Sequence, residues 1–328
     1  MIRALDWRDL SLLRRLRDRG VCLDAQQAFC RGHHTLANTL LGLVSPTLNV
    51  HTLVSRPDGP EDPAAVAQIL HHNSDTLARL AFITPEGALS SASGLALLEG
   101  VCQAAGERGA LNLAAEVDED SPAFAGLRRA GFAIYARQNV WALPTPAEAA
   151  REGRPDAQSR QLWRTEIGSD RSAVHFLYAN LVPALVQQIE PPPARGSRGL
   201  VYWQGGELLG YLEVERGPLG TWVQPYFHPA VEQTHALLVD LLAHGPVSRA
   251  RPVFVCVRSY QGWMNGLLER LGFGLCASQA VMVKRLAATV RRPALARLPA
   301  IEGTRAEPTA PIVRLHDRPP APKAGQRP

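Results

Sequence analysis

The sequence lacks any apolar run long enough to cross a membrane. Its 328 residues contain no uncharged apolar stretch of about 18 residues, the length that begins to suggest a membrane-spanning helix. The stretch from Met1 to Asp6 also has no apolar core of the kind that a signal peptide needs. We therefore expect a cytoplasmic protein without a membrane partner.

Cysteine is scarce, and no metal-ligand spacing occurs. The cysteines are odd in number, widely spaced and mostly set in apolar runs, which argues against a disulfide framework and favours reduced thiols. No two histidines stand four apart and no two cysteines are closely paired, so the usual zinc patterns are missing. We expect no metal. The five cysteines are Cys22, Cys30, Cys102, Cys256 and Cys276.

Lysine is almost absent, since only Lys284 and Lys323 occur, and arginine carries nearly all the positive charge. The net charge of +5 is placed unevenly. From Arg285 to Pro328 nine basic residues stand against three acidic ones, a charge of +6, which leaves −1 for the preceding 284 residues. These arginines are dispersed among eight prolines, which argues against nucleic acid as a partner and favours a disordered tail.

The composition that remains is that of a folded globular protein. Apolar residues make up 46% and charged residues 20% of the chain, which excludes wholesale disorder and fibrous folds. The length suits two domains, because single hydrophobic cores stop growing beyond about 250–300 residues. We place an N-terminal domain at 1–143, a linker rich in Pro, Ala, Arg and Glu at 144–161, a C-terminal domain at 162–286 and the tail at 287–328.

The two predicted domains repeat one order of strands and helices. Hydrophobic periodicity and turn residues predict the same succession in both, with one further segment, 21–45, that is helical or irregular. Both copies close a short helix with a similar hexapeptide, Leu127 to Phe132 and Leu268 to Phe273, which indicates an internal duplication. The first copy has strands at 2–5, 49–55, 65–72, 77–84, 111–117 and 133–143 and helices at 7–19, 91–107 and 121–130. The second has strands at 162–167, 199–204, 208–215, 221–227, 252–257 and 274–284 and helices at 170–189, with Asp170 as its cap, 231–243 and 260–271.

This order, with a short helix closing in Gly-Phe before the last strand, resembles the GNAT (Gcn5-related N-acetyltransferase) superfamily, here as a tandem pair. The resemblance implies an α/β fold with a mixed sheet whose fourth and fifth strands splay apart into a V. It further implies acetyl-CoA as co-substrate in the V, its pyrophosphate at the following helix start, and transfer of the acyl group to a small-molecule or peptide amine. The alternative is an inactive tandem of this fold that binds a ligand or another protein.

In the first copy the resemblance places the pyrophosphate loop at Leu89 to Gly94. Small residues there permit close approach of a phosphate to backbone N–H groups, and hydroxyls can contact it. A helix start capped by serine explains the same residues without any cofactor. The backbone edge that would stabilise the oxyanion is at 82–84. The predicted cofactor-binding residues are Phe82, Ile83, Thr84, Ser90, Ser91, Ala92, Ser93 and Gly94.

Other positions depart from the family pattern. The corresponding loop of the second copy, Phe227 to Thr234, has no glycine and carries Glu232, so we expect no conventional CoA binding there. The tyrosine that the family places four residues before the closing glycine is Leu127 in one copy and Leu268 in the other. Glu116 and Asp118, at the end of the fifth strand, are candidate catalytic bases, and ordinary solvated acids at a strand end are the alternative.

Overall fold

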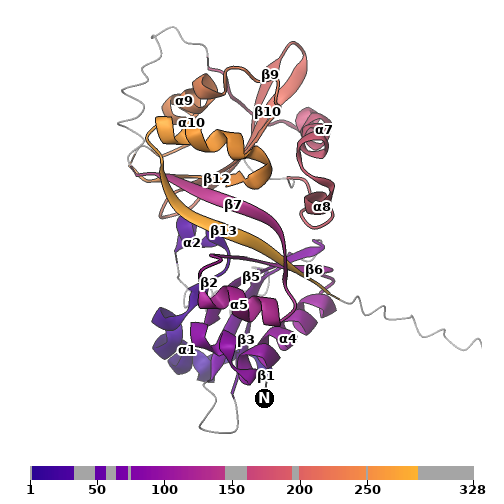
Figure 1. The fold of residues 1–328 in the computed structure, drawn as a ribbon, viewed down its shortest axis with the longest axis vertical. Helices are drawn as coiled ribbons and strands as arrows, with labels where there is room; N and C mark the ends of the chain where they lie inside the picture. The colour runs from indigo at the N-terminus through magenta and orange to yellow at the C-terminus, as the bar shows by residue number, and fades with distance from the viewer. Residues whose placement is uncertain are drawn as a thin grey trace, which may run out of the picture. The chain divides into compact units, whose positions relative to one another are not determined.

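The computed structural model describes residues 2–32, 49–56, 64–72, 75–144, 161–193, 199–248 and 250–286 (Figure 1). Met1–Thr289 form one compact unit. The tail at 287–328, nearly all of the linker at 144–161 and the later part of segment 21–45 lie outside the described residues. None of the described helices is both long enough and apolar enough to cross a membrane. We call residues 1–143 the first half and residues 162–286 the second half.

The first half contains the predicted strands and helices, with a strand and a helix in the segment whose structure the sequence left open. Among the described residues, 3₁₀ turns form both ends of the helix predicted at 7–19, and another 3₁₀ turn precedes the longest helix. The strands are β1 (Ile2–Ala4), β2 (Val21–Cys22), β3 (Val50–Ser55), β4 (Ala65–Leu70), β5 (Leu77–Thr84), β6 (Asn112–Val117) and β7 (Ala133–Leu143), and the helices are α1 (Leu10–Leu16), α2 (Ala25–Arg31), α4 (Ala92–Glu107), α5 (Pro122–Arg129), η1 (Trp7–Asp9), η2 (Arg17–Arg19) and η4 (Glu86–Ser90).

The second half follows the same order with one correction. The single helix predicted at 170–189 is two helices, because Val182 takes an extended conformation and Pro183 cannot continue a helix. The strands are β8 (Arg164–Thr165), β9 (Leu200–Gln204), β10 (Glu207–Arg216), β11 (Thr221–Phe227), β12 (Val253–Arg258) and β13 (Gly274–Arg285), and the helices are η5 (Gly168–Asp170), α7 (Arg171–Leu181), α8 (Ala184–Gln187), α9 (Thr234–His244), η6 (Ser259–Met264) and α10 (Asn265–Arg270).

The two halves exchange their last strands within one mixed sheet. The strand order is β1-β3-β4-β5-β6-β13-β7-β12-β11-β10-β9-β8, with β2 paired to β5 off this path. The last strand of the second half, β13, therefore pairs with β6 of the first, and the last strand of the first half, β7, pairs with β12 of the second. The long strands β7 and β13 cross the centre of the molecule side by side (Figure 1).

The exchange carries side chains into the opposite core. Ala280 and Met282 of β13 are buried in the core beneath α4 and α5 of the first half. Trp141 and Leu143 of β7 are buried in the core beneath α9 and α10 of the second half. Each core is thus completed by residues of the other half, so the hydrophobic burial that stabilises one half depends on the presence of the other.

The centre of the sheet has an internal near-twofold relation. Gln138 and Gln279 each follow the closing glycine of the preceding short helix, Gly131 and Gly272, by seven residues. These equivalent residues lie directly opposite one another in the β7–β13 ladder, and Gln138 Nε2 donates to Gln279 Oε1 at 2.9 Å. The duplication inferred from the sequence therefore relates the two strands that meet at the centre.

A second repeat, an arginine and an aspartate six residues apart, opens each half. Arg164 donates to both carboxylate oxygens of Asp170 at 2.6 Å, and the Ile167 N–H donates to the same carboxylate. Arg3 holds Asp9 in the same way, at 2.7 and 3.0 Å. Asp170 stands at the predicted N-cap position of α7, but its carboxylate makes no capping bond to α7 and instead accepts the Ile167 N–H at the start of η5.

Candidate functional site

The V that the resemblance implies is present in both halves. In the first, β5 and β6 pair in parallel only through Leu77–Arg79 and Asn112–Ala114 and then diverge. In the second, β11 and β12 pair only through Thr221–Val223 and Val253–Val255. The two gaps begin at equivalent positions, where a GNAT cofactor is expected.

The V of the first half is filled by the chain itself. Strand β2 pairs with the end of β5, Val21 opposite Ile83 and Cys22 opposite Phe82. The next residue, Leu23, donates its N–H to Ala81 O at 2.9 Å, and its carbonyl accepts from the Glu116 N–H at 2.8 Å. Since Ala81 is on β5 and Glu116 on β6, the Leu23 backbone bridges the two diverging strands.

A side chain fills the corresponding place in the second half. The Gln261 amide donates through Nε2 to Pro225 O at 2.8 Å and accepts through Oε1 from the Phe227 N–H at 3.2 Å. Pro225 is the equivalent of Ala81, because each stands four residues after the first residue of the parallel ladder. Gln261 is buried. The backbone carbonyl at this equivalent position, Ala81 in one half and Pro225 in the other, therefore accepts a hydrogen bond from within the chain.

The predicted phosphate loop is a capped helix start. Ser91 Oγ accepts from the Gly94 N–H at 3.1 Å and lies 2.9 Å from Ser93 Oγ, so the interpretation of this loop as a serine cap is confirmed. The preceding turn, η4, folds over the helix start, and a Cβ on Gly94 would lie 1.8 Å from the Ala88 carbonyl oxygen. Glycine at position 94 therefore leaves the space that the η4 turn occupies.

Acyl-CoA does not fit the first half in this arrangement. The resemblance places the cofactor in the V beside β5, and β2 with Leu23 occupies the edge of β5 there. Thr84, the last residue of β5, is buried and donates its hydroxyl to Leu16 O. Ser90 and Ala92 are exposed beside the capped start of α4. The cofactor roles of 82–84 and 90–94 stay predictions.

The two candidate bases, Glu116 and Asp118, have different surroundings. Glu116 is buried, accepts from the Ala25 N–H at 2.7 Å and lies 3.7 Å from Arg79. Burial, with a smaller contribution from Asp24, raises the pKa of Glu116. Asp118 is exposed and accepts from the Asp120 N–H in a surface turn, the arrangement of an ordinary solvated acid.

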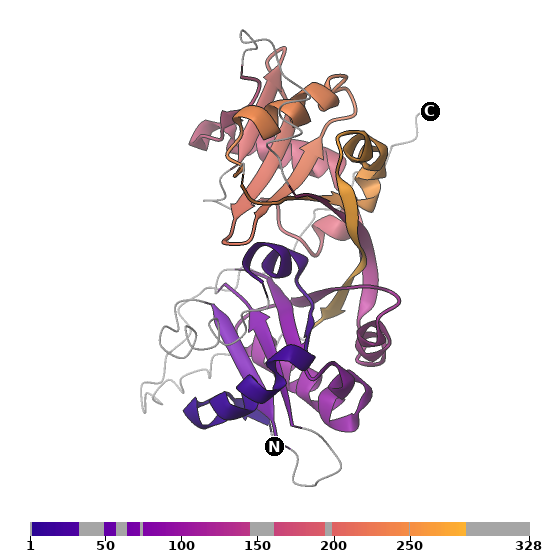
Figure 2. The same cartoon turned by 90° about the vertical axis from the view of Figure 1, so that its left-hand side faces the viewer.

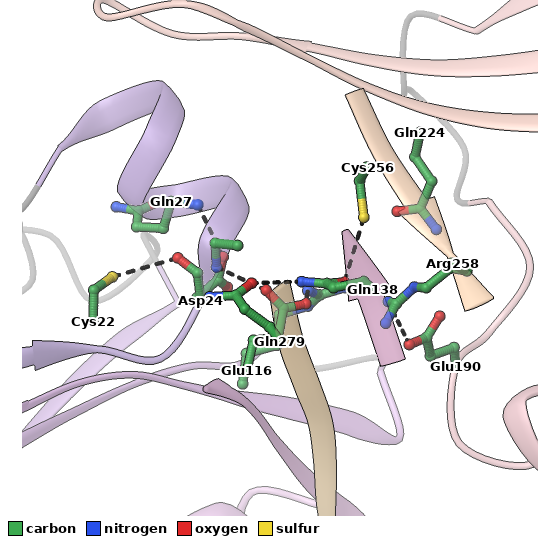
Figure 3. A network of polar contacts seen from close by, with 12 residues as sticks. Cys22, Asp24, Gln27, Glu116, Gln138, Glu190, Gln224, Cys256, Arg258 and Gln279 are labelled. Atoms are coloured by element: carbon green, nitrogen blue, oxygen red, sulfur yellow. Dashed lines mark hydrogen bonds and ion pairs between the residues drawn. The ribbon is translucent and has the colours of Figure 1, made fainter. Parts of the chain in front are cut away.

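A row of polar side chains crosses the centre of the sheet, from the start of α2 through β13, β7 and β12 (Figure 3). At its far end Arg258 is buried and donates to Glu190 at 2.6 Å. Tyr135 of the first half donates to the same carboxylate. Burial and then Glu190 raise the pKa of Tyr135. Arg258 Nε and Nη1 have no partner among the described residues.

Beside this row lies a cavity of about 510 Å³ with walls from both halves. The first half contributes the helix α2, which packs against β11 (Figure 2), and the start of β5. The second half contributes β10, β11 and the three prolines that follow Glu190. Sequence reasoning missed every charged residue of this cavity. A charged residue within an otherwise apolar strand could have indicated them, as Arg79 does between Leu77 and Phe82.

Among the described residues, no group of three or more histidine, cysteine, aspartate or glutamate side chains is placed to hold a metal ion. The sequence matches no protein-family model and no curated protein sequence.

The fold is similar to solved structures over most of the chain. The structure of a GCN5-related N-acetyltransferase from Sphaerobacter thermophilus superposes with a TM-score of 0.52 at 15% identity, covering 87% of this chain and 95% of that one. A Drosophila protein gives a TM-score of 0.50 at 14% identity, with 88% and 98% covered. A tandem GNAT protein from the clavulanic acid biosynthesis pathway gives 0.49 at 16% identity, with 87% and 98% covered. With the V present in each half, this chain has the mixed α/β fold of the GCN5-related N-acetyltransferases.

Proposed function

We propose that this chain is a small-molecule-binding protein built on the GNAT fold, with its ligand in the cavity between the two halves. The observation that carries the proposal is the bridge that Leu23 makes across the V of the first half. The position of an acyl-CoA arm is thereby taken by the chain, whereas the 510 Å³ cavity is of the size that small ligands occupy.

Opening the first V would be costly. A cofactor there would have to replace the β2–β5 pairing and both backbone bonds of Leu23, each worth about 1 kcal/mol net. It would also expose the Leu23 side chain, which is 1% exposed, at a further cost of about 1.5–3 kcal/mol. Leu127 and Leu268, which stand where the family has its proton-donating tyrosine, are fully buried in the two cores.

The second candidate is an acyl-CoA-dependent N-acyltransferase that uses the second half. One observation favours it: the group that occupies the V of the second half is the side chain of Gln261, which can rotate away without moving the backbone. The start of α9 also has no side-chain cap among the described residues, and Glu232 and Gln233 are exposed beside it. The negative charge of Glu232 opposes a bound pyrophosphate.

Acetyl-CoA binding distinguishes the two functions. At millimolar acetyl-CoA we expect no rise in the melting temperature of the wild-type protein, whereas a micromolar site would raise it measurably. A rise would contradict the proposal. In that case Ala92→Glu places a charge at the exposed start of α4, and Glu232→Ala removes one at the start of α9. Loss of the rise with the first variant would locate the cofactor in the first half, and a larger rise with the second variant would locate it in the second.

A further inference from the structure

We infer that the ligand of the cavity between the halves is an organic cation, whose positive group is held by the Glu213 carboxylate with Asp24 on the facing wall. The inference rests on the proposed function and specifies its ligand. Three observations carry it: the composition of the walls, the excess of acidic over basic side chains around the cavity, and the position of the Glu213 carboxylate on the cavity wall.

The walls combine charge with apolar surface. Asp24 and Arg79 reach the cavity from the first half, and Glu213 reaches it from β10 of the second. Leu77, Tyr226 and the three prolines Pro191 to Pro193 supply apolar surface. A ligand with a charged group and a hydrocarbon part can therefore satisfy both kinds of wall, and the face of an aromatic ring such as Tyr226 also attracts a cation.

Acidic side chains outnumber basic ones around the cavity. Five acids line it, against two arginines and one histidine. Three of the five have a basic partner within 4 Å, and Asp24 and Glu213 have none among the residues that the structure describes. The three pairs are Glu190 with Arg258 at 2.6 Å, Glu215 with Arg31 at 2.8 Å, and Asp75 with His72 at 3.6 Å.

The one remaining arginine of the lining cannot balance the remaining acids. Arg79 lies 3.7 Å from Glu116, which stands behind it in a small adjoining pocket together with Asp24. Asp24 accepts from the Gln27 N–H at 2.9 Å and Glu116 from the Ala25 N–H at 2.7 Å, whereas Glu213 has Arg79 as its nearest source of positive charge on the cavity wall. Acidic groups therefore outnumber Arg79 here, and a cation bound in the cavity would stabilise the charged forms of Glu116 and Glu213, which burial disfavours.

Glu213 lines the cavity and, unlike Asp24, accepts no hydrogen bond within the described part of the chain. Its neighbours on β10, Leu212 and Val214, are buried on the opposite face of the strand, which turns the Glu213 side chain toward the cavity. None of the described residues forms a hydrogen bond or an ion pair with its carboxylate. Burial raises its pKa, the charge of Arg79 opposes this rise, and the carboxylates of Glu190 and Glu215 add to it. A ligand cation would supply the missing partner.

The test uses three small molecules of equal chain length and different charge: putrescine, succinate and butanediol. We measure their binding to the full-length protein by titration calorimetry and by the shift in melting temperature. Putrescine is expected to bind and to stabilise the protein, and succinate and butanediol are not. Stabilisation by succinate in place of putrescine would overturn the inference and would make Arg79 the receptor of an anion.

The variant Glu213→Gln assigns the binding to this carboxylate. It keeps the shape and removes the charge, so the affinity for putrescine should fall about tenfold or more. Because burial disfavours the charged form of Glu213, the variant without ligand should melt at the wild-type temperature or above it. Glu207→Gln is the matched control, because Glu207 is on the same strand, is exposed and lies outside the cavity.

Different results would contradict the proposed function and the inference about the ligand. If putrescine binds with equal affinity to the wild type and to Glu213→Gln, the inference about the ligand is wrong, even if acetyl-CoA leaves the melting temperature unchanged. If acetyl-CoA binds and putrescine still depends on Glu213, the proposed function needs revision while the cation site stands. Absence of putrescine binding to the wild type, measured at millimolar concentration, would also overturn the inference.

Discussion

At the scale of single residues, the arginine–aspartate pairs at the start of each half hold the local structure. Each aspartate is buried, and its carboxylate bonds both an arginine and a backbone N–H three residues earlier. The bonds are charge-assisted and bidentate, the strongest class of side-chain hydrogen bond. The spacing of six residues is visible in the sequence at Arg3 and Asp9 and again at Arg164 and Asp170, so this signal was available and was missed.

Replacing one of these aspartates should destabilise the protein in a pH-dependent manner. The bonds from Arg164 hold the pKa of Asp170 below its ordinary value. Its contribution is therefore present above the unfolded pKa of about 3.9 and is lost as the pH falls through the folded value. We expect Asp170→Asn to lower the free energy of unfolding by about 1.5–3 kcal/mol at pH 7.

The measurement is urea unfolding at pH 7 and at pH 3. The difference between Asp170→Asn and wild type should shrink at the lower pH, because pH 3 lies below the unfolded pKa and the stability gained from the charged carboxylate falls as the pH approaches the depressed folded pKa. Asp120→Asn is the control, since Asp120 is exposed in a surface turn. An equal loss at both pH values would show that shape, and not charge, matters at Asp170.

A substitution at Gly94 tests whether η4 packs tightly against the start of α4. Alanine favours a helix over glycine by about 1 kcal/mol. At this position its Cβ would lie 1.8 Å from the Ala88 carbonyl oxygen, so η4 would have to move. We expect Gly94→Ala to destabilise by about 1–3 kcal/mol, measured by thermal unfolding. Gly87→Ala is the control, because no atom lies within 4 Å of that Cβ, and equal melting temperatures for the two variants would contradict the packing described.

At the scale of elements, β7 and β13 tie the halves together. The edge of β6 in the first half is covered by β13 of the second, and the edge of β12 by β7. A half on its own would expose an unpaired strand edge and part of its core. Fragments of residues 1–143 and 162–286 should therefore fold poorly or self-associate when separate, and form a stable one-to-one complex when mixed.

Circular dichroism measures the folding of the separate and mixed fragments, and sedimentation measures their association. Cooperative unfolding of residues 1–143 as a monomer, with the stability of the full chain, would contradict a dependence of the halves on each other. The domain boundaries placed from the sequence are also tested in this way, because a domain in the strict sense folds without its neighbour.

Sequence reasoning succeeded where local chemistry decides the structure. Strands such as β5 and β12 follow from apolar runs, and the closing glycines Gly131 and Gly272 take the positive φ that ends a helix. It failed where distant segments meet. The pattern of β13 is the same whether it pairs with a strand of its own half or of the other. Leu23 likewise carries no local sign that it bridges two strands 58 and 93 residues further on.

At the scale of the whole molecule, the GNAT fold provides a frame whose two V-shaped gaps are filled by the chain. Leu23 fills one with backbone and Gln261 fills the other with a side chain. A cavity of about 510 Å³ with polar and apolar walls lies between the halves and belongs to neither alone. Function in this chain is therefore expected at the junction that the duplication created.

The presence of both halves in one polypeptide frees their equivalent positions to differ. In a homodimer with this sheet, every charge near the axis would appear twice, and an unsymmetrical ligand would meet two equal ways of lying in the cavity. Here Arg79 reaches the cavity from β5, while the equivalent position on β11 is Val223, buried in the core. A ligand with two different ends consequently has one preferred orientation, which a symmetric pair of chains could not impose.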